Sequence, residues 1–163
     1  QNNYQNGYQQ PQGYAPPPPP PPPPYQPSNA PVGQLKTDRN FWLWFFLSGI
    51  TLGIYPIILF SGISTDINTI ASRYDGKKTM HFCLMAFVLS GITLGIYPII
   101  WYHGLSSRIE AELKRRNIVY DFGAKDFWLW ACLGSLIGVG PMIYTYKLFK
   151  AMNMLSERYN QFG

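Results

Sequence analysis

A stretch of twelve residues occurs twice without a change, as LSGITLGIYPII at positions 47–58 and again at positions 89–100. A repeat of this length does not arise by chance, so the chain contains an internal duplication. A third, more divergent copy follows, because FWLW at 127–130 repeats FWLW at 41–44, and GVGPMI at 138–143 takes the place of GIYPII. The sequence therefore predicts one structural unit used three times, over residues of about 36–78, 79–121 and 122–163.

Each copy has the same layout: an apolar, aromatic-rich run, a Gly-x-x-Pro break, and a second apolar run that becomes amphipathic and charged. Proline is favourable in the first turn of a helix, because its missing N–H would be unpaired there. Glycine just before it permits a tight reversal. Each break is therefore predicted to end one helix and to begin the next. The break residues are Gly53, Pro56, Gly95, Pro98, Gly138 and Pro141.

The charged part of each copy carries apolar residues at helical spacing. This spacing predicts an amphipathic helix whose apolar stripe lies on the membrane surface or on a neighbouring helix. The stripes consist of Ile63, Ile67 and Ile70, of Leu105, Ile109 and Leu113, and of Leu148, Met152 and Leu155.

Two topologies fit the apolar runs. Three membrane spans, over Phe41–Ile63, Phe82–Leu105 and Phe127–Tyr146, would each be long enough, since about 20 apolar residues cross a bilayer. Such spans would place their two short basic connections on opposite sides, against the positive-inside tendency. If the chain turns back at each break, all 13 Lys and Arg residues lie on one side and the uncharged turns on the other. The charge distribution therefore favours three helical hairpins.

The predicted hairpins are short. Each first arm has about 11 to 13 residues, or roughly 16 to 20 Å of helix, whereas the hydrocarbon core is about 30 Å thick. Re-entrant hairpins of this length are expected to pack against each other and against other copies of the chain, because the backbone of a buried turn needs hydrogen-bond partners. Small residues that would permit such packing are Ser48, Gly49, Ser90, Gly91, Gly134 and Ser135.

Aromatic and basic residues beside the apolar runs predict contacts with the membrane interface. Tryptophan rings favour the headgroup level, and lysine and arginine favour anionic headgroups. The predicted interfacial anchors are Trp42, Trp44, Trp101, Trp128 and Trp130. The predicted headgroup contacts are Lys77, Lys78, Lys114, Arg115 and Arg116.

Residues 1–35 form a separate region without a charged residue, before the predicted membrane domain at 36–163. Nine consecutive prolines at 16–24 predict an extended polyproline II rod of about 28 Å, at about 3.1 Å per residue. This composition is typical of a disordered spacer, but proline-rich segments also dock into partner domains, and Tyr/Gln/Asn-rich segments self-associate. The chain begins with Gln1 rather than Met, which leaves open whether another segment precedes it.

No arrangement of residues indicates an enzyme, a metal site or a cofactor other than bound lipid. His81 and His103 lack partners at ligand spacing, and Cys83 and Cys132 are predicted to be buried free thiols. The basic residues adjoin apolar runs and form no separate patch, which argues against nucleic-acid binding. Charged residues are absent from the apolar runs, which argues against a transporter.

The segment TLGIYPIIWY at 93–102, and its copy from Thr51, resemble a bacterial family of small multi-pass membrane proteins known only as a domain of unknown function. The resemblance covers about residues 40–160 and implies a bacterial membrane location without an activity. Members often carry an N-terminal zinc ribbon before a Pro/Gln/Tyr-rich linker. Residues 1–35 look like such a linker, and this sequence has no ribbon.

The sequence thus predicts an all-α integral membrane protein of the bacterial cell membrane, with three tandem hairpins and with charged connections and both termini on the cytoplasmic side. Because hairpins that enter from one side act as wedges, we expect a non-enzymatic homo-oligomer that shapes or coats membrane as a tubule or filament. The alternative is a membrane anchor whose proline-rich tail recruits a proline-rich-motif binding protein. A small channel or transporter is a third possibility.

Overall fold

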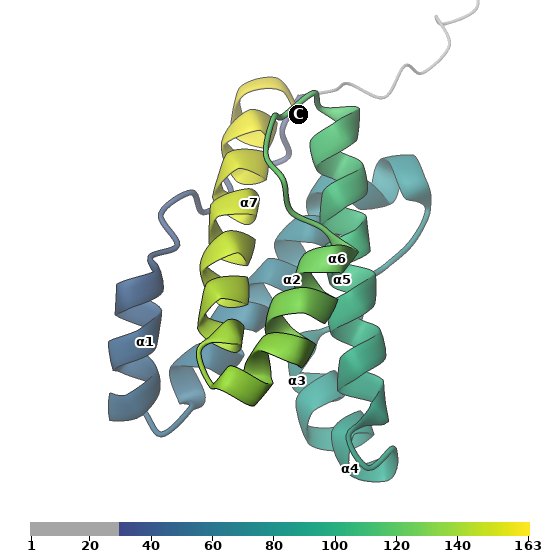
Figure 1. Cartoon of the computed structure of the whole chain (residues 1–163). Helices are drawn as coiled ribbons and strands as arrows, with labels where there is room; N and C mark the ends of the chain where they lie inside the picture. Colours follow the sequence, from purple (N-terminus) through teal and green to yellow (C-terminus); the bar gives the residue numbers. More distant parts are fainter. Residues whose placement is uncertain (1–29) are drawn as a thin grey trace, which may run out of the picture.

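The computed structural model describes residues 30–163, and the regular secondary structure of this part of the chain is helical throughout, as the sequence predicts. Three short helices alternate with three long ones (Figure 1). The short ones are α1 (Phe41–Ile50), a continuous helix from α3 (Phe82–Leu84) through a π-helical turn to α4 (Ser90–Ile92), and one from α6 (Ala124–Asp126) to Ile137. The long ones are α2 (Ile54–Asp75), α5 (Ile96–Arg115) and α7 (Gly140–Phe162).

All three short helices lead to the same end of the molecule, where the chain reverses into the following long helix (Figure 1). The glycine at each reversal has a φ of +85° to +90°, a conformation that glycine adopts without the steric cost of a side chain: Gly53, Gly95 and Gly138. Each break proline lies in the first turn of its long helix. The three-span alternative is therefore wrong about the helices, because no helix of the described chain continues through a break.

The core lies between the three long helices, which all contact one another. Each of the nine residues in the predicted apolar stripes is at most 1% exposed. The stripes therefore face neighbouring helices of the same chain and not the membrane surface. The charged parts of the long helices surround this core.

Each long helix also packs against the short helix of the next hairpin. α2 contacts α3, α5 contacts α6, and α7 returns to contact α1, so the three hairpins form a closed ring. Packing of α7 against the first hairpin joins the two ends of the described chain.

The segment before α1 lies along α7. The Val32 N–H donates to the Tyr159 hydroxyl at 3.0 Å, and Asn160 binds the Leu35 N–H and carbonyl at 2.7 and 2.8 Å. These contacts hold the chain beside the C-terminal half of α7. Residues 1–29, and with them the polyproline prediction, lie outside the described residues.

Candidate functional site

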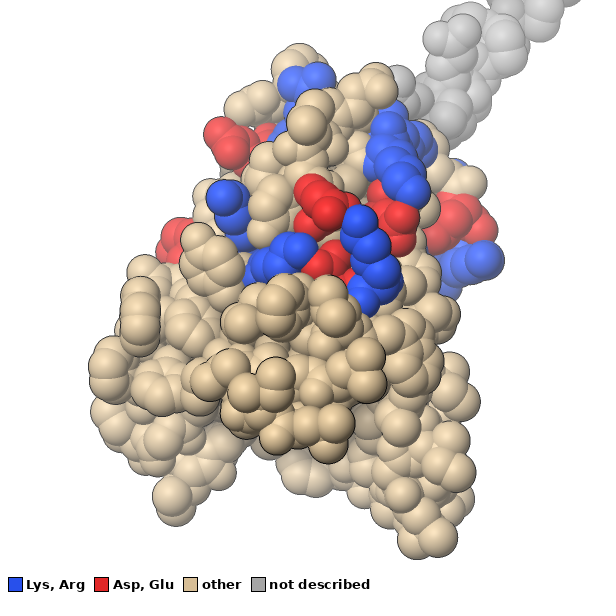
Figure 2. Space-filling model, in the orientation of Figure 1, with Lys and Arg blue, Asp and Glu red and all other residues tan. Residues whose placement is uncertain are grey.

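The end of the molecule that carries the three reversals has an apolar surface. Figure 2 shows Lys, Arg, Asp and Glu only on the opposite half of the visible face. Of the 28 large hydrophobic residues that are exposed in the described chain, only four lie outside 42–58, 84–100 and 128–146. Large contiguous apolar surfaces are rare on soluble monomers and mark sites of membrane or protein contact.

One helix in the described part of the chain, α2, is long and apolar enough to cross a membrane by its length and composition. One third of its most apolar 18-residue window is buried inside the protein. The helices Phe41–Ile50 and Phe82–Ile92 are also apolar but shorter. Since a core helix of a soluble protein can meet the same criteria, α2 is weak support for membrane association.

The first chain reversal pairs its own backbone N–H groups. The N–H groups of residues 51–54 donate to nearby carbonyls at 2.9 to 3.3 Å. The Thr51 hydroxyl accepts the Tyr55 N–H at 3.0 Å and donates to the Leu47 carbonyl at 2.6 Å. Pro56 follows and has no N–H to satisfy. This reversal therefore needs no water for its N–H groups, which is one part of what a turn within hydrocarbon requires.

The second reversal repeats these bonds. The Thr93 hydroxyl accepts the Tyr97 N–H at 3.0 Å and donates to the Leu89 carbonyl at 2.6 Å. The sequence predicts that neighbouring protein satisfies the backbone of the turns. For the N–H groups of these two turns that expectation is wrong, because a threonine within the turn supplies the missing partner.

A leucine with a left-handed backbone conformation and an exposed side chain occupies the apex of each of these two reversals. Leu52 and Leu94 have φ values of +50° and +49° and are 93% and 92% exposed. The left-handed conformation costs about 1–2 kcal/mol for a residue with a side chain. Full exposure of leucine to water is also unfavourable. An apolar environment at the apex would remove this second cost.

The end of the molecule opposite to the reversals carries the charged residues and is called the charged end. There, Arg108 of α5 joins the end of α2 to the segment before α3. Its guanidinium donates to both carboxylate oxygens of Asp75 at 2.6 and 3.0 Å, to the Lys77 carbonyl at 2.6 Å and to the Thr79 hydroxyl at 2.9 Å. Burial by itself raises the pKa of the Asp75 carboxyl, but hydrogen bonds from Arg108 and from the Lys77 N–H outweigh it and lower this pKa below its ordinary value. Arg108 thus acts as a joint between consecutive hairpins.

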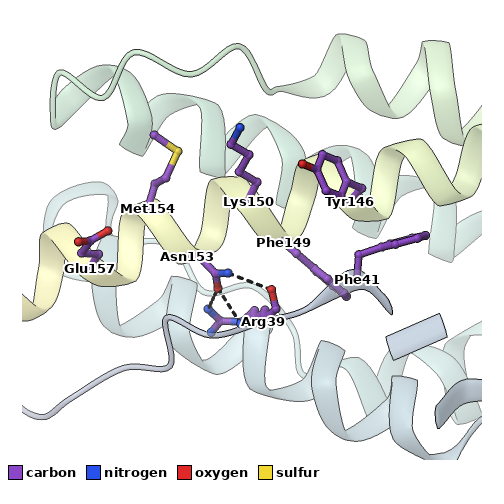
Figure 3. A pocket seen from close by; sticks show the side chains of 8 residues that line it. All are labelled: Arg39, Phe41, Tyr146, Phe149, Lys150, Asn153, Met154 and Glu157. Atoms are coloured by element: carbon purple, nitrogen blue, oxygen red, sulfur yellow. Dashed lines mark hydrogen bonds between the residues drawn. The ribbon is translucent and has the colours of Figure 1, made fainter. Parts of the chain in front are cut away.

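A second joint uses one repeated position of the long helices. Asn68 binds the N–H and the carbonyl of Thr79 at 2.7 and 2.8 Å. Asn153 binds the N–H and the carbonyl of Arg39 in the same way, at 3.1 and 3.0 Å (Figure 3). The backbone N–H and carbonyl groups in the segment before a short helix have no partner in a regular helix. Each asparagine side chain supplies a hydrogen-bond partner for both groups.

Glu110 occupies the equivalent position in the second hairpin. Its carboxylate accepts the Ala124 N–H at 3.3 Å, at the first residue of the third short helix. The pKa of Glu110 is lowered, first by the hydrogen bond from Lys114. All three long helices thus bind the segment that leads into the next short helix, and Asn153 closes the ring.

The joint between α7 and α1 borders a shallow pocket of about 240 Å³ (Figure 3). Asn153 and the Arg39 backbone face each other there, and the Arg39 guanidinium pairs with Asp66. The rings of Phe41 and Tyr146 meet edge to face with centroids 6.1 Å apart. Arg39 and Asn153 are paired within the protein, so this part of the pocket has a structural role as a joint.

Two larger grooves lie at equivalent places in the first two hairpins. The Lys36 groove, of about 500 Å³, lies between α2 and the segment 34–39. The Lys77 groove, of about 480 Å³, lies between α5 and the segment 75–80. The helix positions that line both grooves correspond in the repeat, as Tyr55 and Tyr97, Ile58 and Ile100, Leu59 and Trp101, Gly62 and Gly104, and Asp66 and Arg108.

A glycine keeps each groove open. A Cβ atom added to Gly62 or Gly104 would meet no atom within 4 Å. In the third hairpin the equivalent position is Lys147, whose ammonium group pairs with the buried carboxylate of Asp126. A paired lysine side chain therefore lies where the first two hairpins have a glycine.

The predicted interfacial tryptophans differ in their surroundings. Trp42 and Trp128 are exposed, at 65% and 49%, and the Trp128 indole donates to His103 at 3.2 Å. Trp44 and Trp130 are half-buried. Trp101 is only 5% exposed and donates to the Met80 carbonyl at 2.8 Å, so its predicted role as an anchor is wrong and it is a core residue.

The predicted headgroup contacts also separate into two groups. Lys77 and Lys78 are exposed beside the Lys77 groove. Lys114 and Arg115 form ion pairs with glutamates of the same helix. Both residues lie near the end of α5, almost 30 Å along the helix from its first residue at a rise of about 1.5 Å per residue. Arg116 is buried against Glu112 and the Gly163 carbonyl, so it has a structural role within the protein in place of the predicted one.

The small residues behave differently in the three hairpins. A Cβ on Gly134 would lie 2.8 Å from the Gly140 Cα, so the arms of the third hairpin are in close contact there. Ser135 beside it is exposed. A Cβ on Gly49 or Gly91 would meet nothing within 4 Å, so their predicted packing role is not fulfilled within the chain. The neighbouring serines of the first two hairpins, Ser48 and Ser90, donate to carbonyls of their own helices.

Sequence reasoning missed the joints and the grooves. Asn68 and Asn153 recur in register, as do Gly62 and Gly104, and this recurrence could have indicated them. Cys83 and Cys132 are free thiols as predicted but half-buried. Residues 30–163 contain no group of three or more His, Cys, Asp and Glu side chains that could hold a metal ion.

No curated protein and no solved structure matches this chain. Most of the first two hairpins and most of the lining of both grooves lie within one family match. Residues 39–111 match the model of a family described as a domain of unknown function (DUF4234), in agreement with the resemblance to a family of unknown function.

Proposed function

We propose that this chain is a non-enzymatic membrane protein whose three hairpins insert into one leaflet and shape the membrane. The observation that carries the proposal is the division of the surface into an uncharged apolar end, which holds all three reversals, and a charged end (Figure 2). An apolar surface of this extent gains free energy when it leaves water. The charged end would remain outside the hydrocarbon.

The apolar end has about the depth of one leaflet. α1 has 10 residues, which corresponds to about 15 Å. The uncharged part of α2, from Ile54 to Thr65, corresponds to about 18 Å at the same rise per residue. The hydrocarbon core is about 30 Å thick, so reversals at this depth would lie near its middle. Insertion into one leaflet enlarges that leaflet and favours curvature.

The hydrogen bonding of the first two reversals supports this placement. Thr51 and Thr93 complete the N–H bonding of their turns, and the exposed apex residues Leu52 and Leu94 are apolar. A reversal without these features would carry unpaired polar groups into hydrocarbon at a cost of several kcal/mol each.

The charged end would face the cytoplasm of a bacterial cell, because basic residues favour that side of the membrane. Gly49 and Gly91 leave open helix faces at the apolar end, which a second copy of the chain could cover. Assembly of copies in this way would give a tubule or a filament on the membrane.

A membrane anchor with a recruiting tail is the second candidate. The contacts of residues 32–39 with α7 attach the described N-terminal segment at the charged end. A tail attached there would be accessible to a soluble partner.

Cysteine labelling in vesicles tests the depth of insertion. In a Cys83→Ser, Cys132→Ser background, Leu52→Cys, Leu94→Cys and Leu136→Cys place a thiol near each reversal, and Arg73→Cys places one at the charged end. With a membrane-impermeant maleimide, the Arg73→Cys thiol should react from one side and the other three from neither side. Reaction of the reversal thiols from the side opposite to Arg73→Cys would show spanning hairpins and contradict insertion into one leaflet.

Electron microscopy of the same vesicles tests the shaping of membrane. Tubules or strongly curved vesicles are expected as the ratio of protein to lipid increases. Vesicles that keep their size and shape with the protein inserted would contradict membrane shaping and leave the anchor as the better candidate.

A further inference from the structure

The two equivalent grooves differ in charge although their shapes correspond. The Lys77 groove is lined by three basic residues and one acidic residue: Lys77, Lys78, Arg108 and Asp75. The Lys36 groove is lined by two of each: Lys36, Arg39, Asp38 and Asp66. The Lys77 groove is therefore the basic member of a pair whose other member is neutral.

The basic charge of the Lys77 groove is available to a ligand. Arg108 is engaged by Asp75 and by backbone and side-chain acceptors around it. Lys77 and Lys78 are exposed, and neither ammonium group pairs with a carboxylate in the described part of the chain. Two uncompensated positive charges therefore lie at one end of the groove.

The groove is polar at one end and apolar at the other. Asp75, Lys77 and Lys78 lie at the charged end of the molecule. Towards the reversal, Tyr97 and Ile100 line the groove, and Ile100 is 58% exposed. Ile96 and Ile99, which continue the same helix, are also exposed. The groove therefore opens onto the apolar surface that the proposed function places in hydrocarbon.

Gly104 lies between these two ends. Its missing side chain leaves the middle of the groove open, so one elongated molecule can contact both ends. A volume of about 480 Å³ is typical of a small-ligand site. It accommodates a headgroup and the first part of an acyl chain, and the rest of the chain would lie along the exposed isoleucines.

We infer that the Lys77 groove binds one anionic phospholipid, with its phosphate near Lys77 and Lys78 and an acyl chain along Gly104 and Ile100. This inference rests on the proposed function, because only a protein inserted to the level of Ile100 meets a lipid in this orientation. The charge of the groove complements the headgroup, and its apolar end continues into the surface that contacts acyl chains. Binding of this lipid would select membranes that contain it.

The Lys36 groove provides a matched control within the same chain. Gly104→Leu fills the Lys77 groove and Gly62→Leu fills the Lys36 groove, and neither Cβ meets another atom. Lys77→Gln with Lys78→Gln removes the charge and keeps side chains of similar length at this end of the groove. These exposed substitutions are expected to fold, which circular dichroism and thermal unfolding check.

Native mass spectrometry of the full chain, extracted in mild detergent from vesicles of phosphatidylglycerol and phosphatidylcholine, counts bound lipid. Wild type and Gly62→Leu should retain one phosphatidylglycerol with equal affinity. Gly104→Leu should lose it, and the double lysine variant should bind it roughly 25-fold more weakly, at about fivefold per lysine. Equal loss in Gly62→Leu, or no loss in Gly104→Leu, would overturn the inference. Binding of inorganic phosphate in place of the lipid would overturn it as well.

Flotation of the same proteins with vesicles separates the two proposals. Wild type that does not float with either lipid would overturn insertion itself and the groove inference with it. Wild type that floats with both lipids but retains no phosphatidylglycerol would overturn only the groove inference.

Discussion

Asn153 binds both backbone groups of Arg39, 114 residues earlier in the sequence, and so fastens the last hairpin to the first. Asn68 makes the same pair of bonds to Thr79, only 11 residues ahead of it. The same chemistry therefore serves once as a local connection and once as the closure of a ring. Closure over such a distance orders a long part of the chain, which is entropically costly.

Replacement of Asn153 by alanine is expected to destabilise the ring. Asn153→Ala leaves the N–H and carbonyl of Arg39 without these partners, at a cost of about 1–3 kcal/mol. The free energy of unfolding in detergent micelles, from a denaturant titration, measures the effect. Gln161→Ala, at an exposed position of the same helix, is the control and should change little. If both variants unfold alike, the asparagine does not hold the ring closed.

The threonines of the first two reversals should matter more in lipid than in water. Thr51→Val and Thr93→Val keep the side-chain shape but leave the N–H of Tyr55 or Tyr97 unpaired. Loss of such a cap costs about 1 kcal/mol in water, and more where no water can replace it. The fraction of protein that resists extraction from vesicles should fall for the valine variants and stay near wild type for Thr51→Ser and Thr93→Ser. Equal behaviour of serine and valine would contradict a role for the hydroxyl.

Stability should depend on pH through the joint at Arg108. The pKa of Asp75 is lower in the folded protein than its ordinary value of 3.8, so its carboxylate stabilises the fold above that value and less as the pH falls through the lowered pKa. Asp75→Asn should therefore be less stable than wild type at pH 7, and the difference should shrink at pH values below about 4. Unfolding titrations of both proteins across this range measure it. A difference that is independent of pH would contradict a role for the ionised carboxylate.

The third hairpin should tolerate alanine less well than the second. Gly140→Ala would put a Cβ 2.2 Å from the Trp130 carbonyl oxygen and 2.4 Å from the Gly134 Cα, both of which are backbone atoms. Overpacking of this kind costs about 1–3 kcal/mol. Gly91→Ala, which faces open space, should be neutral or stabilising by up to about 1 kcal/mol in the isolated protein. Thermal unfolding of both variants compares them, and the reverse order would contradict the close contact of the third hairpin.

Local patterns were enough to predict several elements of the fold. Helical periodicity identified the stripes, such as Ile63, Ile67 and Ile70, that form the core, because a 3.6-residue period places them on one face whatever the partner. Glycine and proline identified the reversals, because their backbone preferences act within a few residues. The role of Trp101 could not be predicted, since an indole near the end of an apolar run can lie at an interface or fill a core.

The candidate site was less predictable than the fold. Gly62 and Gly104 were visible as glycines inside helices, but their grooves exist only because the segments 34–39 and 75–80 lie opposite them. Recurrence in register could have indicated a shared role, but not a groove. The charge difference between the grooves comes from the helix residues Asp66 and Arg108, because the segments 34–39 and 75–80 each contribute one more basic than acidic residue.

The sequence by itself determined that the chain repeats a helix, a reversal and a longer helix, because these features depend on residues close together in the chain. Only the tertiary structure decided that the stripes face one another, that Asn153 reaches Arg39, and that Arg108 is engaged while Lys77 and Lys78 remain exposed. These outcomes depend on how the three long helices pack against one another. The local spacing of residues along a helix does not specify this packing, because the same spacing is compatible with a helix face that contacts a neighbouring helix, a membrane surface or water.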